Sequence, residues 1–403
     1  MNKFEVAIVG GGAAGLLCAV ELLKNENAFN GKQIAIIERN DRVGKKLIAT
    51  GNGRGNLSNT HISCDCYHGN PVFIKKIVND ILNFNLKKYF QFFGVETTEE
   101  NGKIFPLSFQ ANSFLDIIRA YLISKGAQII TSTKIINIKK DKDFFCLKSI
   151  DNLFYAKNVV LAVGGKCAKQ FGTDGSSYVL AESFGHKTTK LYPSLVQLKT
   201  DLEPIRGLKG IKEYAKISAF DGDTFLKSAE GDLLFTEFGL SGSSIFSISG
   251  YLAQCKNPYL SIEFLPSVEF NNLQNIIQDR LTKNYFVDCG ILTGLLNKKI
   301  GEKIVRDNKN KNGTLSSLSL ANSIKNYRVK VTGTLGMDYA QVTKGGIITD
   351  NINSTTFESE LEKNLYIVGE MLNVDGDCGG YNLTFAFISG ITAGRSIKES
   401  FNR

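Results

Sequence analysis

Glycines near the N-terminus stand at the spacing that a bound dinucleotide requires. A G-x-G-x-x-G hexad lies between an apolar, strand-like run at 4–9 and a helical pattern at 16–24. In such a hexad the first glycine permits a tight turn, the second lets a pyrophosphate approach the backbone, and the third brings helix and strand together. The N–H groups that open the helix would then face the phosphates. The predicted contacts in this turn are Gly10, Gly12, Ala13, Ala14 and Gly15.

An acidic residue follows the hexad at the distance expected for a ribose contact. Glu38 ends a second strand-like run at 33–37. An acid about 20 residues beyond the hexad hydrogen-bonds the adenosine ribose. The adjacent Arg39, also a predicted contact, is a basic residue of the kind that accommodates a 2′-phosphate. Glu38 nevertheless favours FAD or NAD over NADP.

A loop rich in glycine and asparagine favours FAD over NAD. It occupies residues 39–59, where a nicotinamide-binding domain would normally continue with further strand–helix units. Glycines in such a loop allow the backbone to approach a cofactor along its length, and Arg54 offers a fixed fork for a phosphate or a flavin carbonyl. The predicted contacts here are Lys46, Thr50, Gly51, Asn52, Gly53, Arg54 and Asn56.

Two distant segments complete the predicted FAD site. Strand-like runs at 158–163 and 364–368 end in a glycine pair and in a Gly-Glu pair. We expect the last strand to lie beside the first, with its acid on the ribityl chain and a following helix N-terminus aimed at the flavin. Tyr381 and Arg54 are candidate catalytic side chains, Tyr381 as packing or as proton donor. The predicted contacts are Gly164, Gly165, Gly369, Glu370, Asp375, Gly376, Gly379, Gly380, Tyr381, Asn382 and Leu383.

These segments resemble the BaiN-like (YhiN-type) bacterial FAD-dependent oxidoreductases over essentially the whole chain. The segments that carry the resemblance are 10–15, 45–56, 341–346, 369–376 and 379–383. The resemblance implies an α/β fold, in which a glutathione-reductase-like FAD-binding Rossmann domain is interrupted by an inserted β-barrel and a small helical domain. Members of that family are assigned reduction of conjugated enones or of a ribosomal RNA uridine, and NAD(P)H is the implied transient co-substrate.

The chain departs from that family at two positions. Gly55 stands where a cysteine is common, and Cys378 stands where a residue such as threonine is expected. Neither position therefore supports a redox disulfide.

Patterning along the chain predicts a split FAD domain. We expect its first part at 1–190, an insertion at 191–334, and its second part at 335–403. Alternating segments predict a small β-barrel or sandwich at about 191–266, of which the resemblance implies the barrel, and helical runs predict a small helical domain at about 267–330.

Length, composition and charge limit the classes of protein to which the chain can belong. The 403 residues, with 43% hydrophobic and 22% charged side chains, indicate a globular protein of two to three domains. Eight cysteines without a secretory signal and no long apolar stretch predict a cytoplasmic protein with no membrane contact. Nine of the Lys and Arg residues lie between Lys298 and Lys330, against two acidic residues. This stretch could contact ribosomal RNA or be a solvated face.

A cluster of thiols and imidazoles could suggest a metal. His61, Cys64, Cys66 and His68 fall within eight positions, without the C-x-x-C spacing of zinc sites. We predict no metal and interpret the cluster as a thiol-bearing loop near the flavin. The segment 172–177 is either a helix cap or a wall of the substrate cleft.

The sequence favours one function and leaves two others open. The first is an FAD-dependent, NAD(P)H-linked oxidoreductase that reduces an activated C=C bond, such as that of a ribosomal RNA uridine. The alternative is an amine or aminoketone oxidase that uses dioxygen. The third is a non-enzymatic, redox-sensing RNA-binding protein. No stable protein partner is predicted.

Overall fold

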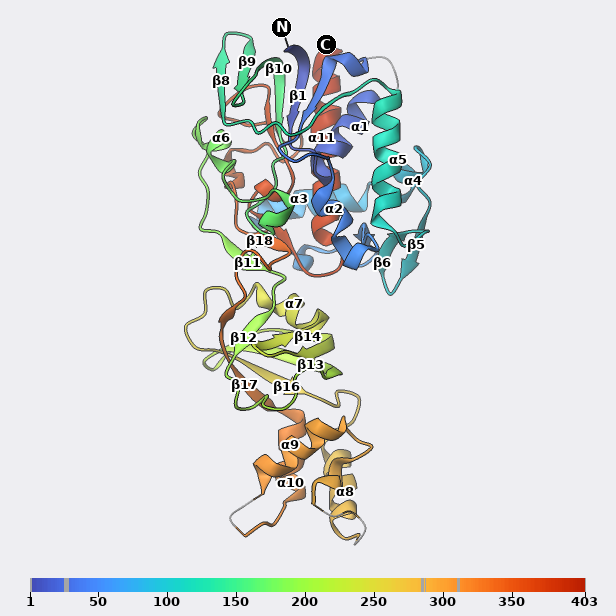
Figure 1. The fold of residues 1–403 in the computed structure, drawn as a ribbon, viewed down its shortest axis with the longest axis vertical. Coiled ribbons are helices and arrows are strands. Elements are labelled where there is room, and N and C mark those ends of the chain that lie inside the picture. Colours follow the sequence, from blue (N-terminus) through green and yellow to red (C-terminus); the bar gives the residue numbers. More distant parts are fainter. Residues whose placement is uncertain (1, 25–28, 284–285, 287, 310–311, 403) are drawn as a thin grey trace. The chain divides into compact units, whose positions relative to one another are not determined.

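The computed structural model describes residues 2–24, 29–283, 286, 288–309 and 312–402, which form two compact units (Figure 1). Unit 1 combines Met1–Tyr192 with Val342–Arg403, and unit 2 is Pro193–Gln341. In the part of the chain that the structure describes, no helix is both long enough and apolar enough to span a membrane.

A mainly parallel sheet forms the centre of unit 1. Strand β1 (Asn2–Val9) lies between β2 (Ile34–Ile37) and β10 (Leu153–Leu161), and β7 (Gln128–Ile130) flanks β2. The three pairings among these four strands are all parallel. The ends of β1 and β2 are buried on both faces, which is why they appear in the sequence as continuous apolar runs.

The strand pairing at the far edge of this sheet differs from one prediction. Strand β10 pairs antiparallel with β9 (Phe144–Lys148) through its first half, and β9 pairs with β8 (Asn137–Asp141). The end of β10 pairs parallel with β19 (Leu365–Ile367). The expectation that the last strand lies beside the first was wrong, because β2 and β10 already occupy both edges of β1.

Two helices from opposite ends of the chain pack together in unit 1. Helix α1 (Ala13–Leu23) has ten buried residues among its eleven, and it contacts α11 (Tyr381–Phe401) (Figure 1). A Cβ on Gly390 would lie 2.1 Å from the carbonyl oxygen of Ala14. A Cβ on Gly394 would lie 2.9 Å from the carbonyl oxygen of Cys18. Glycine in α11 therefore lets the two backbones touch.

Shorter elements surround this core of unit 1. A three-stranded sheet has the order β3-β6-β5, and β4 pairs antiparallel with β20. The bounds are α2 (Lys45–Ile48), β3 (Ser58–Asn59), β4 (Tyr67–Gly69), α3 (Pro71–Leu82), α4 (Leu86–Gln91), β5 (Thr97–Glu100), β6 (Lys103–Pro106), α5 (Ala111–Ser124), α6 (Tyr178–Glu182), β11 (Tyr192–Ser194), β18 (Val342–Lys344) and β20 (Val374–Gly376).

Unit 2 is a closed barrel with a separate hydrophobic core. Its strand order is β12-β15-β14-β13-β16-β17, and helices α8 to α10 are inserted between β16 and β17. The bounds are β12 (Leu198–Thr200), β13 (Lys212–Asp221), β14 (Thr224–Phe235), β15 (Gly239–Ser241), α7 (Ser243–Ser249), β16 (Pro258–Glu263), α8 (Phe270–Leu281), α9 (Lys298–Asn308), α10 (Ser317–Lys325) and β17 (Tyr327–Thr334).

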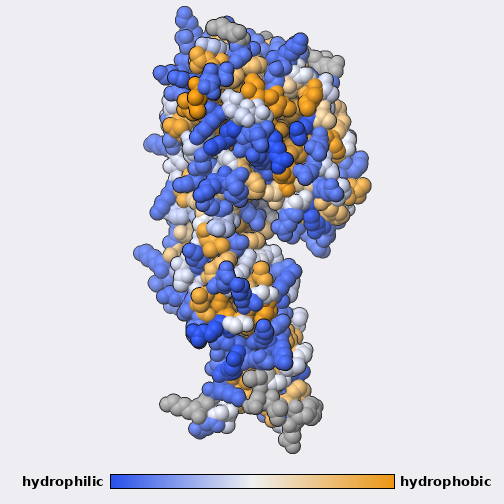
Figure 2. Space-filling model, viewed as in Figure 1, coloured by the Kyte–Doolittle hydropathy of each residue, from blue (hydrophilic) through white to orange (hydrophobic). Residues whose placement is uncertain are grey.

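The surface carries hydrophobic and hydrophilic residues side by side. On the face shown in Figure 2, both kinds are intermixed over each unit.

We expect Gly390→Ala to destabilise the protein although alanine favours helix by about 1 kcal/mol over glycine. The added Cβ would collide with the Ala14 carbonyl, and overpacking of this kind costs about 1–3 kcal/mol. The midpoint of thermal unfolding should fall. The exposed α11 variant Glu399→Ala is the control, and equal midpoints for both variants would contradict the tight contact.

Candidate dinucleotide-binding site

The turn between β1 and α1 is tightly packed at two glycines and open at a third. Gly10 has φ +107°, and a Cβ there would lie 2.3 Å from the carbonyl oxygen of Ala162. A Cβ on Gly15 would lie 2.1 Å from the Gly10 carbonyl oxygen. Beyond its neighbours in the chain, no heavy atom of the described residues lies within 4 Å of a Cβ built on Gly12. The start of α1 therefore opens onto free space, as a bound phosphate group requires.

The acid after β2 is bonded directly to this turn. Glu38 is buried, and its Oε2 accepts a hydrogen bond of 2.8 Å from the backbone N–H of Gly11. Its Oε1 accepts bonds of 2.8 and 2.7 Å from the backbone and side-chain nitrogens of Asn40. These bonds fix the carboxylate beside the hexad and leave lone pairs for further donors.

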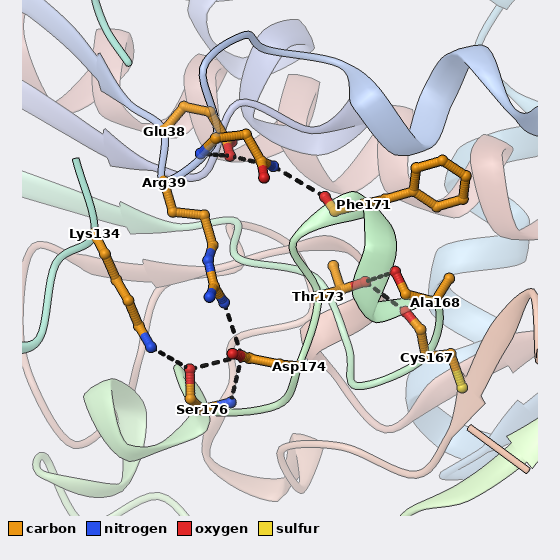
Figure 3. A network of polar contacts seen from close by, with 10 residues as sticks. Glu38, Arg39, Lys134, Cys167, Ala168, Phe171, Thr173, Asp174 and Ser176 are labelled. Atoms are coloured by element: carbon orange, nitrogen blue, oxygen red, sulfur yellow. Dashed lines mark hydrogen bonds and ion pairs between the residues drawn. The ribbon is translucent and has the colours of Figure 1, made fainter. Parts of the chain in front are cut away.

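A polar network connects the end of β2 to the segment after β10 (Figure 3). Arg39 forms an ion pair of 2.8 Å with Asp174, which also accepts bonds of 2.9 and 2.6 Å from the backbone and hydroxyl of Ser176. Burial alone would raise the pKa of Asp174, but the bonds from Arg39 and Ser176 outweigh it and lower that pKa. Asn40 donates to the Phe171 carbonyl at 2.9 Å. The segment 166–176 is thus held against the end of β2.

A second acid, Glu370, is connected to three other segments by hydrogen bonds. Glu370 accepts a bond of 2.6 Å from Lys46 Nζ and one of 2.9 Å from the backbone N–H of Thr343. The Thr343 hydroxyl accepts bonds of 2.8 and 3.0 Å from the backbone N–H groups of Lys166 and Cys167. A Cβ on Gly165 would lie 2.3 Å from that hydroxyl oxygen.

Thr343 was not among the predicted contacts. Its segment, 341–346, was one of those that carried the family resemblance, but nothing in the local pattern singled out this hydroxyl. Its role depends on two backbone N–H groups more than 170 residues away.

An unpaired polar atom lies at the start of α11. Asn56 Oδ1 is buried and has no hydrogen-bond partner among the described residues. A Cβ on Gly380, which has φ +103°, would lie 2.8 Å from this oxygen. Gly380 is also the N-cap of α11, with no side-chain cap within the described chain. Buried polar groups normally have partners, so this arrangement fits a bound polar ring.

The segment before α11 holds a buried carboxyl group. Asn382 fastens this segment, because its amide accepts from Gly376 N at 2.8 Å and donates to Gly376 O at 2.7 Å. Asp375 is 3% exposed, and burial raises its pKa to about 6, against the opposing charges of Lys344 and His68. The sequence predicted Asp375 as a cofactor contact and gave no signal of this shift.

The first candidate catalytic side chain, Tyr381, is bonded within the protein. Its hydroxyl donates to the His61 carbonyl at 3.3 Å, and its ring lies edge-on to Tyr67 at 6.0 Å. Burial and a hydrogen bond with Cys66 raise the pKa of Tyr381. The phenol therefore stays protonated at neutral pH.

The second candidate, Arg54, is also engaged by protein groups. Its guanidinium forms an ion pair with Glu100 and lies 4.5 Å from the ring centroids of both Phe105 and Phe109. The loop before it turns through the left-handed conformation at Gly51 and Asn52.

The remaining predicted cofactor contacts lie on the segments described above. Thr50 Oγ1 donates to the Leu47 carbonyl at 2.7 Å, which is a bond within the loop. Gly369 approaches the hexad, because a Cβ there would lie 2.9 Å from the Ala14 Cβ. The others are Ala13, Gly53, Gly164, Gly379 and Leu383.

The thiol and imidazole cluster is dispersed. His68 bonds Asp377 at 2.9 Å, Cys66 contacts Ser63 Oγ at 3.4 Å, and Cys64 is exposed. Among the described residues, no group of three or more His, Cys, Asp or Glu is placed to hold a metal ion. Burial raises the pKa of Cys378, which disfavours a reactive thiolate there.

Comparison with known proteins finds relatives along the whole chain. A family model described as "HI0933-like protein Rossmann domain" matches residues 4–396. A 3-dehydro-bile acid delta(4,6)-reductase of Clostridium scindens is 33% identical over 99% of this chain and 100% of its own length. Ribosomal RNA dihydrouridine synthases of Haemophilus influenzae and Escherichia coli are 28% and 27% identical, over 98% and 96% of both chains.

Solved structures share the fold at low identity. A 3-ketosteroid-delta4-(5alpha)-dehydrogenase from Rhodococcus jostii has a TM-score of 0.52 at 12% identity, over 98% of this chain and 97% of its own. The quinol fumarate reductase subunit FrdA of E. coli has a TM-score of 0.51 at 16% identity, over 100% and 71%. The predicted fold class, a Rossmann-like FAD-binding domain interrupted by a barrel-containing insert, is confirmed.

We expect Thr343→Val to destabilise unit 1, because it leaves the N–H groups of Lys166 and Cys167 without their acceptor. An unsatisfied buried donor costs about 1–3 kcal/mol. The urea midpoint should fall, whereas the exposed Thr332→Val serves as the control. An unchanged midpoint for Thr343→Val would show that the two donors find other partners.

Asp375 should make the stability depend on pH. Its folded pKa, about 6, lies above the ordinary 3.8, so its contribution is full below about pH 4 and is lost as the pH rises through about 6. Asp375→Asn should remove this loss and raise stability at pH 8 by up to about 3 kcal/mol. Urea unfolding at pH 5 and pH 8 measures it, with the exposed Asp65→Asn as control. A parallel pH profile for Asp375→Asn and wild type would contradict the raised pKa.

Proposed function

The chain belongs to the HI0933-like family, and on that premise we propose that it is an FAD-dependent oxidoreductase that reduces a C=C bond conjugated to a carbonyl. One observation carries this proposal. The open start of α1 at Gly12 and the unpaired Asn56 Oδ1 beside the start of α11 lie in one unit built from both chain ends. A dinucleotide with a polar ring needs a helix start for its phosphates and an unpaired polar atom for its ring.

The residues of unit 1 fit FAD along its length. The Gly10–Gly15 turn and the start of α1 would hold the pyrophosphate. Glu38, beside this turn, would hold the adenosine ribose. The pair of Glu370 and Lys46 would hold the ribityl chain, and Asn56 with the start of α11 would hold the ring.

When bound, FAD supplies hydride transfer. The chain's own part in the proposed reaction is to orient the groups and to hold a proton. Asp375 can hold one on its carboxyl group, because a pKa of about 6 leaves both forms populated near neutral pH. His68, which stands opposite Asp375 across the β4–β20 pair, bonds Asp377 and so keeps its imidazole nearby.

We propose a uridine of ribosomal RNA as the substrate and NAD(P)H as the reductant. Two of the relatives are named ribosomal RNA dihydrouridine synthases, and a third is named a bile acid reductase. Uridine and a conjugated enone share one reactive unit, a C=C bond polarised by a neighbouring carbonyl. The positive charge of this chain, +9, favours the polyanionic substrate of the two.

Part of the basic stretch between Lys298 and Lys330 is paired within the protein. Lys303 is buried and paired with Asp307 at 2.8 Å, and Lys325 is paired with Glu263 at 2.5 Å. Among the described residues of this stretch, the exposed cations lie on helix α9, on strand β17 and at Lys309, which follows α9. Those on α9 are Lys298, Lys299 and Arg306, and those on β17 are Arg328 and Lys330.

Gly12→Asp should abolish FAD binding without unfolding the chain. The space around a Cβ at this position is open, so the fold should tolerate the side chain, but its carboxylate would repel the pyrophosphate. FAD content after purification should fall about tenfold or more. Gly290→Asp, at another open glycine, is the matched control. Equal FAD content in the two variants would contradict the assigned pyrophosphate site.

Dihydrouridine formation tests the proposed reaction. Purified protein with NADPH or NADH should convert uridine in ribosomal RNA from a strain that lacks this chain, measured by nucleoside mass spectrometry. A conjugated enone steroid serves as the small-molecule comparison. Rapid reoxidation of the reduced flavin by dioxygen with peroxide release, and reduction of neither substrate, would overturn the proposal in favour of an oxidase.

A further inference from the structure

One outer face of the barrel carries a row of aromatic rings that ends in a cation. Phe225 on β14 stands opposite Phe220 on β13, Phe220 stands opposite Tyr259 on β16, and Tyr259 stands opposite Lys330 on β17. Residues that face one another across neighbouring strands project from the same side of the sheet. These four residues, here called the aromatic row, therefore lie side by side across four strands.

The aromatic row lies outside the barrel core. On β13, Ala215, Ile217 and Ala219 are fully buried and point inward, so Phe220 projects outward. Phe225 is 56% exposed. The register shift between Ala219 and Phe220 brings Phe225 into line with Phe220. The barrel interior is thus filled without the aromatic row.

The rings are arranged as a stack. Phe220 and Tyr259 are parallel within 5°, with ring centroids 4.9 Å apart, and Phe225 meets Phe220 edge-on at 5.7 Å. The Arg328 guanidinium lies 5.1 Å from the Tyr259 ring centroid. Cross-strand aromatic pairs of this kind stabilise a sheet. That role alone does not require an exposed Phe225 or two cations at the end of the row.

The charge at this end of the row is positive. Arg328 and Lys330 are both exposed on β17, and neither forms an ion pair with any residue that the structure describes. Arg328 stands opposite Ser261, whose own neighbour on β13 is Ser218, so the residues across from Arg328 on these two strands are small and uncharged. Aromatic rings with free cations beside them are the recognition elements for bases and phosphates.

We propose that this face of the barrel binds a single-stranded segment of RNA. A base would stack on Phe225, which the Phe220–Tyr259 stack supports from beside it, and phosphates would pair with Arg328 and Lys330. One exposed ring suits about one stacked base. This inference rests on the proposed function, because it assigns the surface that would hold the RNA whose uridine is reduced. An acidic peptide could use the cations but would not need the stacked rings.

Binding of a fluorescent single-stranded oligouridylate to the full chain tests the inference. Phe225→Ala should weaken binding about tenfold, since stacking on one aromatic ring contributes about 1–3 kcal/mol per base. Tyr214→Ala is the matched control, because Tyr214 is an equally exposed aromatic of the same barrel outside the row. Lys330→Ala should lower the slope of log affinity against log salt by about 1, whereas Lys212→Ala, whose lysine pairs with Asp232, should leave it unchanged.

The outcomes separate this inference from the proposed function. FAD content and dihydrouridine formation are measured on the same variants. Wild-type affinity in Phe225→Ala, or an equal loss in Tyr214→Ala, would overturn the RNA-binding face even if the wild type forms dihydrouridine. Binding that depends on Phe225 without dihydrouridine formation would overturn the proposed reaction and leave the binding face standing. Tighter binding of an acidic peptide than of the oligouridylate would also overturn the inference.

Discussion

The contact between the backbones of α1 and α11 is the constraint on which unit 1 depends. These helices come from opposite ends of the chain, and they meet closely enough that a single Cβ on Gly390 would collide with the Ala14 carbonyl. The contact fixes the start of α11 relative to the β1–α1 turn. Because both helix starts lack side-chain caps within the described chain, it also fixes the direction of two sets of unpaired N–H groups.

Two buried or half-buried acids position the loops between these helix starts. Glu38 binds the turn itself, and Glu370 binds Lys46 and the backbone of Thr343. Each acid accepts at least one hydrogen bond from a segment distant in the sequence, which offsets the cost of removing a carboxylate from water. The loops that would surround a cofactor are therefore held by electrostatic bonds rather than by regular secondary structure.

The insertion leaves this arrangement intact because it has a core of its own. The barrel closes through β17, which follows the three helices α8, α9 and α10 in the chain. Its inward residues are mainly apolar side chains, and its outward residues are free to differ. An outer face that is not needed for packing can acquire exposed rings and cations, as the aromatic row on β13, β14, β16 and β17 has done.

The sequence by itself determined the features that depend on neighbours along the chain. The glycine hexad and the strand-like runs at 4–9 and 33–37 follow from local periodicity and spacing, and the fold class follows from the resemblance that motifs along the chain carry. Only the tertiary structure decided that β10 separates β1 from β19, that Arg54 faces Glu100, and that Asp375 is buried. The physical reason is that strand order, ion-pair choice and the pKa of a buried acid depend on what surrounds a residue in space. Those surroundings come from segments tens to hundreds of residues away, and local pattern carries no record of them.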